Sequence, residues 1–150
     1  MRIRTLAATI VTSLALGAGA LAAAPSPQAE AFSVLDDFMA AFNARDEEAW
    51  IGTLHFPHVR IASGRTQIDA DAAAFAEGMD FDAFAEATGW HHSAWTSREV
   101  TQAGPEKVHV KVRFTRYRED GSVLAVFDSL YIVAKRDGRW AVAARSSFAP

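Results

Sequence analysis

Apolar residues in the first part of the chain recur every three or four positions, which is the spacing of an amphipathic helix. This pattern predicts a helix over residues 31–44. Asp46 is a suitable N-cap for a second, shorter helix that ends by Gly52 or Leu54. An alanine-rich stretch predicts a third helix over residues 70–87, weakly interrupted by a glycine. The apolar face of the first helix consists of Phe32, Leu35, Phe38, Met39 and Phe42.

After Gly89 the apolar residues alternate with polar ones, and this pattern continues to the end of the chain. Asp120-Gly121 and Asp137-Gly138 are strong signals for hairpin turns, because such turns need positive φ angles. The order of the elements predicts an α+β fold in which three helices pack on one face of a mostly antiparallel sheet. The expected strands are 56–61 and its return strand 65–68, followed by 91–102, 107–118, 123–135 and 139–148.

Two-residue turns at both Asp-Gly sites would determine which residues lie opposite each other in the sheet. They place Arg113 opposite Asp128 and Asp128 opposite Ser147, with Arg145 on the same face. We interpret Arg113, Asp128 and Arg145 as a structural ion-pair group, since paired charges in the middle of strands are commonly structural. A bulged turn would shift one register by a residue and exchange the two faces.

The two faces of this predicted sheet differ in character. The more apolar face should contact the helices. The face with the charges also carries apolar residues, and a sheet with two apolar faces usually has both of them covered. We therefore expect a homodimer formed through the charged face. The residues that this interpretation assigns to the helix-covered face include Phe114, Arg116, Phe127, Tyr131 and Phe148, and the apolar residues of the other face are Val126, Leu130 and Ile132.

Composition and charge limit the classes of function. Half of the residues are apolar and 22% are charged, which is typical of a globular chain. The chain has no cysteine, so neither a thiolate nucleophile nor a sulfur-ligated zinc is available. The net charge is −3 and no long basic tract occurs, so we expect no nucleic-acid partner.

The first residues have the profile of an export signal. Arg2 and Arg4 precede an uncharged, apolar run that ends in small residues, with a cleavage position after Ala22. We predict a signal peptide over residues 1–22, a linker over residues 23–30 and a single domain over residues 31–150. The protein should then be secreted or periplasmic, with no membrane contact after cleavage. The alternative is an uncleaved membrane anchor, because the run just reaches the length of a bilayer span.

Two segments resemble the nuclear transport factor 2-like (NTF2-like) superfamily, and within it the SnoaL-like proteins. They are the stretch from Phe38 to Asp46 that closes the first helix, and Asp137-Gly-Arg-Trp140 at the start of the last strand. The resemblance implies a cone-shaped fold whose helices and curved sheet enclose a pocket, commonly in a homodimer formed through the sheets. It specifies activity poorly, because the superfamily holds isomerases, dehydratases, cyclases, hydrolases and non-catalytic binding proteins.

The catalytic residues of the superfamily's ketosteroid isomerase-like branch do not carry over. The resemblance puts Phe38 at the position of the tyrosine that stabilises the oxyanion, and Ala62 or Ser63 at the position of the proton-transferring aspartate. The epoxide hydrolase-like branch needs two carboxylates on the sheet, and only Asp128 matches. Dehydratase-like chemistry with pocket histidines stays compatible with the residue types.

Candidate functional residues lie where the resembling fold has its pocket. His58 and His91 are candidate proton carriers, with surface or capping roles as the alternative. We expect no metal, because His91-His92 would project to opposite sides of a strand, and no cofactor. Two functions follow: an exported, non-catalytic binder of a small apolar ligand or interaction domain, or a cofactor-free lyase or isomerase. The candidate ligand-binding residues are Arg60, Trp90, Trp95, Phe127 and Tyr131.

Overall fold

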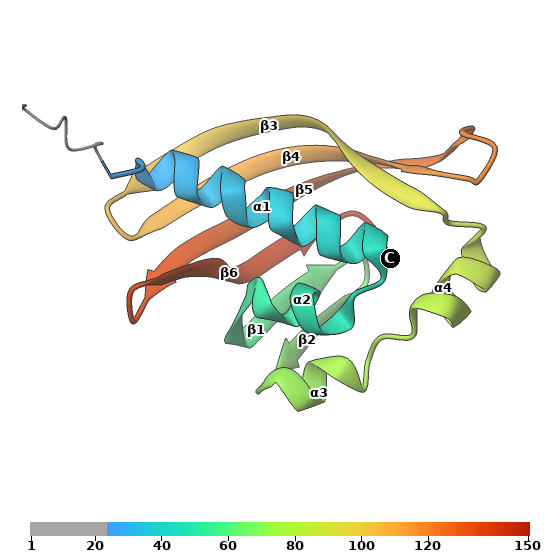
Figure 1. The fold of residues 1–150 in the computed structure, drawn as a ribbon, viewed down its shortest axis with the longest axis horizontal. Helices are drawn as coiled ribbons and strands as arrows, with labels where there is room; N and C mark the ends of the chain where they lie inside the picture. Colours follow the sequence, from blue (N-terminus) through green and yellow to red (C-terminus); the bar gives the residue numbers. More distant parts are fainter. Residues whose placement is uncertain (1–23) are drawn as a thin grey trace, which may run out of the picture.

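A computed structural model describes residues 24–150, and Figure 1 shows their arrangement. The predicted signal peptide, residues 1–22, lies outside the described residues. The elements, in chain order, are α1 (Pro27–Ala44), α2 (Glu47–Gly52), β1 (Leu54–Ala62), β2 (Arg65–Asp69), α3 (Ala72–Ala76), α4 (Phe81–Thr88), β3 (His92–Gly104), β4 (Lys107–Tyr117), β5 (Val123–Arg136) and β6 (Arg139–Ser147). Apart from the ends of the elements and the third helix, these are the elements that the sequence predicts.

Helix α1 begins earlier than the apolar pattern indicates. Pro27 occupies the first turn, where its missing N–H costs nothing, and the Ser26 hydroxyl accepts a hydrogen bond from the Ala29 amide at 3.2 Å. Residues 27–30, which we predicted to belong to a linker, are therefore helical. The helix ends at Ala44, and its C-cap residue, Arg45, has a φ of 56° in the left-handed region.

The predicted third helix over residues 70–87 is two short helices. The carboxylate of Asp71 caps α3 by accepting from the Ala74 amide, and that of Asp80 caps α4 by accepting from the Ala83 amide, both at 2.9 Å. Each aspartate thus starts its own helix, and the chain changes direction between them. We predicted one helix because the alanine-rich composition favours helix throughout the stretch, and we did not recognise the two aspartates as N-caps.

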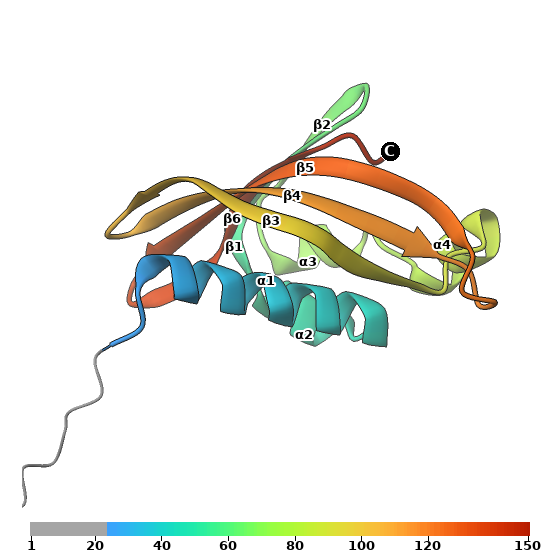
Figure 2. The same cartoon turned by 90° about the horizontal axis from the view of Figure 1, so that it is seen from above.

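The strands form one six-stranded sheet in the order β2-β1-β6-β5-β4-β3. Strand β1 is parallel to β6, and the other neighbouring pairs are antiparallel. Figure 2 shows the sheet curving over α1 and α2, which lie on its concave side. The expected α+β class with helices on one side of a curved, mostly antiparallel sheet is confirmed.

The core lies between α1, α2 and this concave face. Val108, Val110, Val112 and Val133 point inward from β4 and β5 and are at most 1% exposed. On the helix side, the ring of Phe38 packs edge to face on Trp50 and on Tyr131, at centroid distances of 5.5 and 5.6 Å. The hairpin alternation therefore assigned the inward residues of β4 correctly.

The β4–β5 hairpin has the predicted register, with Arg113 opposite Asp128. The turn spans more residues than the two expected, with Gly121 at φ 80°, and a bulge next to Tyr117 restores the register. Arg113 donates two hydrogen bonds to Asp128, from Nε to Oδ1 at 3.0 Å and from Nη2 to Oδ2 at 3.1 Å. Hydrogen bonding from Arg113 lowers the pKa of the Asp128 carboxyl.

The register predicted for β5 and β6 is wrong beyond Val142. Strand β6 has one extra residue, Ala143, so Ser147 lies opposite Ser129 instead of Asp128. The shift turns Arg145 to the concave side, opposite Tyr131, and removes it from the predicted ion-pair group. It also turns Phe148 outward, where its ring is 73% exposed.

His55 joins the start of β1 to the β5–β6 hairpin. Its Nε2 lies 3.1 Å from the Ala134 carbonyl and 3.2 Å from the Arg139 carbonyl, while Nδ1 lies 3.1 Å from Nη2 of Arg139. This arrangement requires a neutral ring that donates from Nε2 and accepts at Nδ1. Burial lowers the pKa of His55, in agreement with a neutral ring.

Replacing His55 by Leu should destabilise the protein by about 1–3 kcal/mol, because buried acceptors and the Arg139 guanidinium lose their partner. Urea denaturation at pH 7.5 measures this loss. His91→Leu changes an exposed ring and is the matched control, expected to alter stability by less than about 0.5 kcal/mol. Equal stability of the two variants would contradict a structural role for His55.

Candidate functional site

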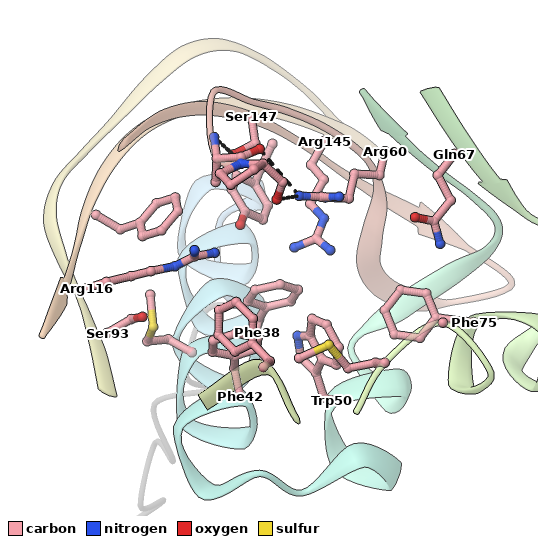
Figure 3. Close-up of a pocket in the computed structure, with 18 of the residues that line it drawn as sticks. Phe38, Phe42, Trp50, Arg60, Gln67, Phe75, Ser93, Arg116, Arg145 and Ser147 are labelled. Atoms are coloured by element: carbon pink, nitrogen blue, oxygen red, sulfur yellow. Dashed lines mark hydrogen bonds between the residues drawn. The ribbon is translucent and has the colours of Figure 1, made fainter. Parts of the chain in front are cut away.

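A cavity of about 470 Å³ opens between the concave face of the sheet and helices α1 to α4. Its volume is within the range of small-molecule sites in proteins. The lining comes from every helix and from all the strands, so residues far apart in the sequence meet there (Figure 3). The cavity is therefore a product of the tertiary fold rather than of one sequence motif.

One side of the cavity is aromatic. Phe38 and Phe42 from α1, Trp50 from α2 and Phe75 from α3 form it, and their rings contact one another edge to face. The Trp50 ring lies 4.9 Å from Phe75 and 5.1 Å from Phe42, measured between centroids. Such a wall suits the flat, apolar part of a small molecule.

Four arginines of the sheet line the cavity, of which Arg65 on β2 is exposed and the other three are partly buried. Arg60 comes from β1, Arg116 from β4 and Arg145 from β6, and Figure 3 shows these three side chains. The Arg145 guanidinium lies 5.3 Å from the ring centroid of Phe38 and 5.6 Å from that of Trp50. These stacking distances are those of cation–π contacts, which hold the guanidinium plane in place.

The other two guanidiniums have different supports. Arg116 stacks against three aromatic rings, at 4.9, 5.0 and 5.8 Å from the centroids of Phe84, Phe127 and Phe114. Arg60 donates from Nη2 to the carbonyl of Ala149 at 3.4 Å and to an oxygen of Pro150 at 2.6 Å. The last residues of the chain thus lie beside the arginines at the cavity.

The electrostatic environment of this cluster disfavours positive charge. Burial, and then the charge of Arg145, lower the pKa of Arg60 to about 10. Burial and the same neighbour also lower the pKa of Arg116. Among the side chains that line the cavity the only carboxylate is that of Asp80, whose Oδ1 caps α4. The cavity therefore carries a positive field in a protein whose formal net charge is −3.

Hydrogen-bond donors without acceptors face the same region. In the described part of the chain, the Nε atoms of Arg116 and Arg145 and the Nε1 atom of Trp50 are buried without a hydrogen-bond partner. All three side chains line the cavity. Buried donors normally have partners, so these three mark a place where acceptor atoms are missing.

Neither histidine predicted to act as a proton carrier lines the cavity. His58 is on β1 but is 0% exposed, and neither of its ring nitrogens makes a hydrogen bond of good geometry. Its ring packs edge to face on Phe75 at 5.9 Å. His91 is exposed, and its Nδ1 lies 3.0 Å from Nδ1 of His92. The structure thus does not bring the two candidates together.

The predicted ligand-binding residues divide into two groups. Arg60, Trp95 and Tyr131 line the cavity. Trp90 is instead a core residue whose Nε1 donates to the Ser93 hydroxyl at 2.9 Å, and Phe127 packs beneath Arg116 outside the lining. Sequence reasoning did not select Arg116 or Trp50, and it assigned Arg145 to the structural ion-pair group instead of the ligand-binding residues. Strand alternation already assigned Arg116 to the helix-covered face. An arginine on that otherwise apolar face was the sequence signal that could have identified it as a site residue.

Two further observations concern the described residues alone. Within residues 24–150, no group of three or more His, Asp or Glu side chains is placed to hold a metal ion. In the same range, no helix has both the length and the apolar character needed to cross a membrane.

Comparison with known proteins identifies the fold. Residues 29–148 match the family described as NTF2-like protein (DUF6841). No curated protein matches the chain in sequence. Among solved structures, a Nostoc punctiforme protein of unknown function with a cystatin-like fold has a TM-score of 0.68 at 16% identity, covering 82% of this chain and 90% of its own.

Two other solved structures are similar over most of their length. A ketosteroid isomerase-like protein from Erwinia carotovora atroseptica has a TM-score of 0.61 at 23% identity, covering 80% of this chain and 93% of that one. A protein from Catenulispora acidiphila in complex with S-DNPA has a TM-score of 0.64 at 18% identity, covering 81% and 91%. At these identities the likeness establishes the fold alone, and the expected NTF2-like fold is confirmed.

The buried His58 should make folding stability depend on pH. Burial, together with the charges of Arg145 and Arg60, lowers its pKa from 6.5 to about 4. Between these two values the unfolded chain binds a proton that the native protein does not, so stability falls as the pH decreases from about 6.5 towards 4. The expected loss from this residue is about 2 kcal/mol by pH 5.

Urea denaturation at pH 7 and pH 5 tests this expectation. His58→Phe keeps an apolar ring in place and should reduce the stability difference between the two pH values by about 2 kcal/mol. His91→Phe is the matched control and should retain the wild-type difference. If His58→Phe retains it as well, protonation of His58 does not contribute to the pH dependence.

Proposed function

The chain belongs to the NTF2-like family described as DUF6841, and from this premise we propose that it is an exported, non-catalytic protein that binds a small molecule in its cavity. The observation that carries the proposal is the hollow between the helices and the sheet, about 470 Å³ in volume and walled by aromatic rings. Had Phe and Trp side chains filled that interior, only a scaffold role would remain.

The composition of the lining supports binding of a ligand with a substantial apolar part. Trp95 and Tyr131 lie on the sheet side and Phe42 lies on the helix side. The Trp95 and Tyr131 rings pack edge to face at 5.7 Å, which holds both in fixed positions before any ligand arrives. A preformed aromatic pocket loses little entropy on binding.

No specific observation favours the alternative, a lyase or isomerase with pocket histidines. Among the described residues the cavity lining includes no histidine, and Asp80 is engaged as a helix cap. The likeness to a ketosteroid isomerase-like protein, at 23% identity, carries no activity to this chain. We therefore propose binding without catalysis.

Blocking the cavity mouth should abolish ligand uptake. Ala83 of α4 lines the cavity although it is exposed, so Ala83→Trp would place an indole in the entrance. The neutral fluorescent probe N-phenyl-1-naphthylamine should bind the wild type and bind Ala83→Trp at least about tenfold more weakly, a difference of about 1.4 kcal/mol.

Ala87→Trp is the matched control for this experiment. Ala87 is exposed on the same helix, one turn further along, and is not part of the cavity lining. It should bind the probe as the wild type does. Absence of probe binding to the wild type, or equal binding to both variants, would overturn the proposal that the cavity takes a small molecule.

We further propose that a second copy covers the convex face of the sheet. Val126 is 51% exposed, Leu130 is 36% exposed and Phe148 is 73% exposed on this side. Contiguous apolar residues of this size on a sheet face are typical of an interface. The Arg113–Asp128 pair lies between Val126 and Leu130 along the strands, so it would be enclosed by the dimer.

Leu130→Glu should weaken the dimer, because two like charges would lie at the interface without partners. Light scattering during gel filtration at micromolar concentration would then give a monomer mass for the variant and a dimer mass for the wild type. Glu119→Gln, an exposed change in the β4–β5 turn, should leave the wild-type mass unchanged. A monomeric wild type would refute the dimer.

A further inference from the structure

We propose that the ligand of the cavity is a small organic acid, with its anionic head among the guanidiniums of Arg60, Arg116 and Arg145 and its apolar body against the aromatic wall. This inference rests on the proposed function, because it names the class of molecule that the same cavity takes. It goes beyond a merely apolar ligand, which would leave the most distinctive residues of the site without a role.

None of the three guanidiniums forms an ion pair with an Asp or Glu side chain of the described residues, although Arg60 donates to an oxygen of Pro150. In the described part of the chain, the basic residues of the ion pairs are Arg45, Arg98, Lys111 and Arg113, all outside the cavity lining. Like charges placed together away from water repel each other, and each also loses hydration. An anion among them would offset both costs, which a neutral or cationic ligand cannot do.

The orientation of the guanidiniums suits an oxyanion. Aromatic rings lie against the guanidiniums of Arg116 and Arg145, with centroids 4.9 to 5.6 Å from Cζ, and the N–H groups are the part of each guanidinium that can bind an oxyanion. A guanidinium edge presents a planar fork of donors that matches the two oxygens of a carboxylate. Figure 3 shows Arg116 and Arg145 extending into the space between the sheet and the helices, with Arg60 beside them, hydrogen-bonded to the last residues of the chain.

The buried side-chain polar atoms of the lining that lack a hydrogen-bond partner are all hydrogen-bond donors. Arg116 Nε, Arg145 Nε and Trp50 Nε1 are donors, and none of the lining residues contributes a buried acceptor without a partner. A ligand that satisfies them must bring acceptor atoms. A carboxylate has about four lone-pair positions and no donor, so it complements this set.

The apolar part of the ligand follows from what surrounds the charges. Beyond the arginines, the lining consists largely of Phe, Trp and Met side chains. A bare inorganic anion would leave that wall empty, and a large charged polymer would not fit a cavity of about 470 Å³. An aromatic or branched aliphatic acid fills both regions at once.

Isothermal titration calorimetry on the full chain can test the head and the body separately. The probes are naphthalene-2-carboxylate, its neutral carboxamide and sodium sulfate, at pH 7.5 and low salt. The carboxylate should bind at least about tenfold more tightly than the carboxamide, because charge-assisted hydrogen bonds are roughly twice as strong as neutral ones. It should also bind more tightly than sulfate, which lacks the apolar body.

Two variants locate the effect in the cavity. Arg145→Met and Arg116→Met keep much of the side-chain length and should each reduce the preference for carboxylate over carboxamide to less than about threefold. Arg113→Met removes an arginine of the convex face and should retain the full preference. Circular dichroism establishes that each variant is folded before titration, and the comparison of probes on the wild type needs no variant.

The outcomes separate this inference from the proposed function. If N-phenyl-1-naphthylamine binds but the carboxylate binds no better than the carboxamide, the organic-acid inference is overturned and the binding function stands. If sulfate binds as tightly as the carboxylate, the apolar body contributes nothing and the inference also fails. If neither N-phenyl-1-naphthylamine nor the carboxylate binds, the proposed function itself fails.

Discussion

The extra residue in β6 is the constraint on which the cavity's chemistry depends. Up to Val142 the strand contributes apolar side chains to the core, and after Ala143 the alternation is shifted by one. Arg145 and Ser147 therefore point to the concave side in place of Ser146 and Phe148. Without the bulge, Ala144 would pair with Tyr131 where Arg145 now does, and the cavity would lose a central charge.

The same place interrupts the pairing of β1 with β6. Leu54 pairs with Val142 and Val59 with Ala144, so four residues of β1 span the distance of one residue of β6. Those four residues include both buried histidines of the strand. His55 is satisfied by backbone carbonyls, whereas His58 is enclosed without a hydrogen bond of good geometry. The irregularity thus accompanies two histidines that are buried in the interior outside the cavity lining.

Aromatic rings have two roles around the cavity. They form the apolar wall, and they hold the cationic side chains that enter it. Arg145 stacks on Phe38 and Trp50, both of which also belong to the core. The charge of Arg145 is therefore packed directly against core side chains. This coupling explains how a positive site persists in an interior that burial and mutual repulsion make unfavourable for it.

The sequence by itself determined the class of fold, the order of the elements and most of the inward face. The spacing of apolar residues and the residue types of a turn are local properties of the sequence. Arg113 and Asp128 could therefore be placed opposite each other from the hairpin alone. The same alternation placed Arg116 and Tyr131 on the helix-covered face. The prediction of a single helix over residues 70–87 was wrong, because two aspartates within this alanine-rich stretch each cap a separate helix.

The sequence indicated Arg60, Trp95 and Tyr131, but the tertiary structure alone decided which other residues complete the site. The bulge in β6 depends on how three strands fit together, and the residue types around Ala143 do not indicate it. For this reason the sequence prediction assigned Arg145 to the wrong face of the sheet. Burial of His58 likewise results from packing against Phe75 on a distant helix. The charged character of the cavity arises because three strands bring Arg60, Arg116 and Arg145 together across the sheet, and such non-local proximity has no signature in a single sequence.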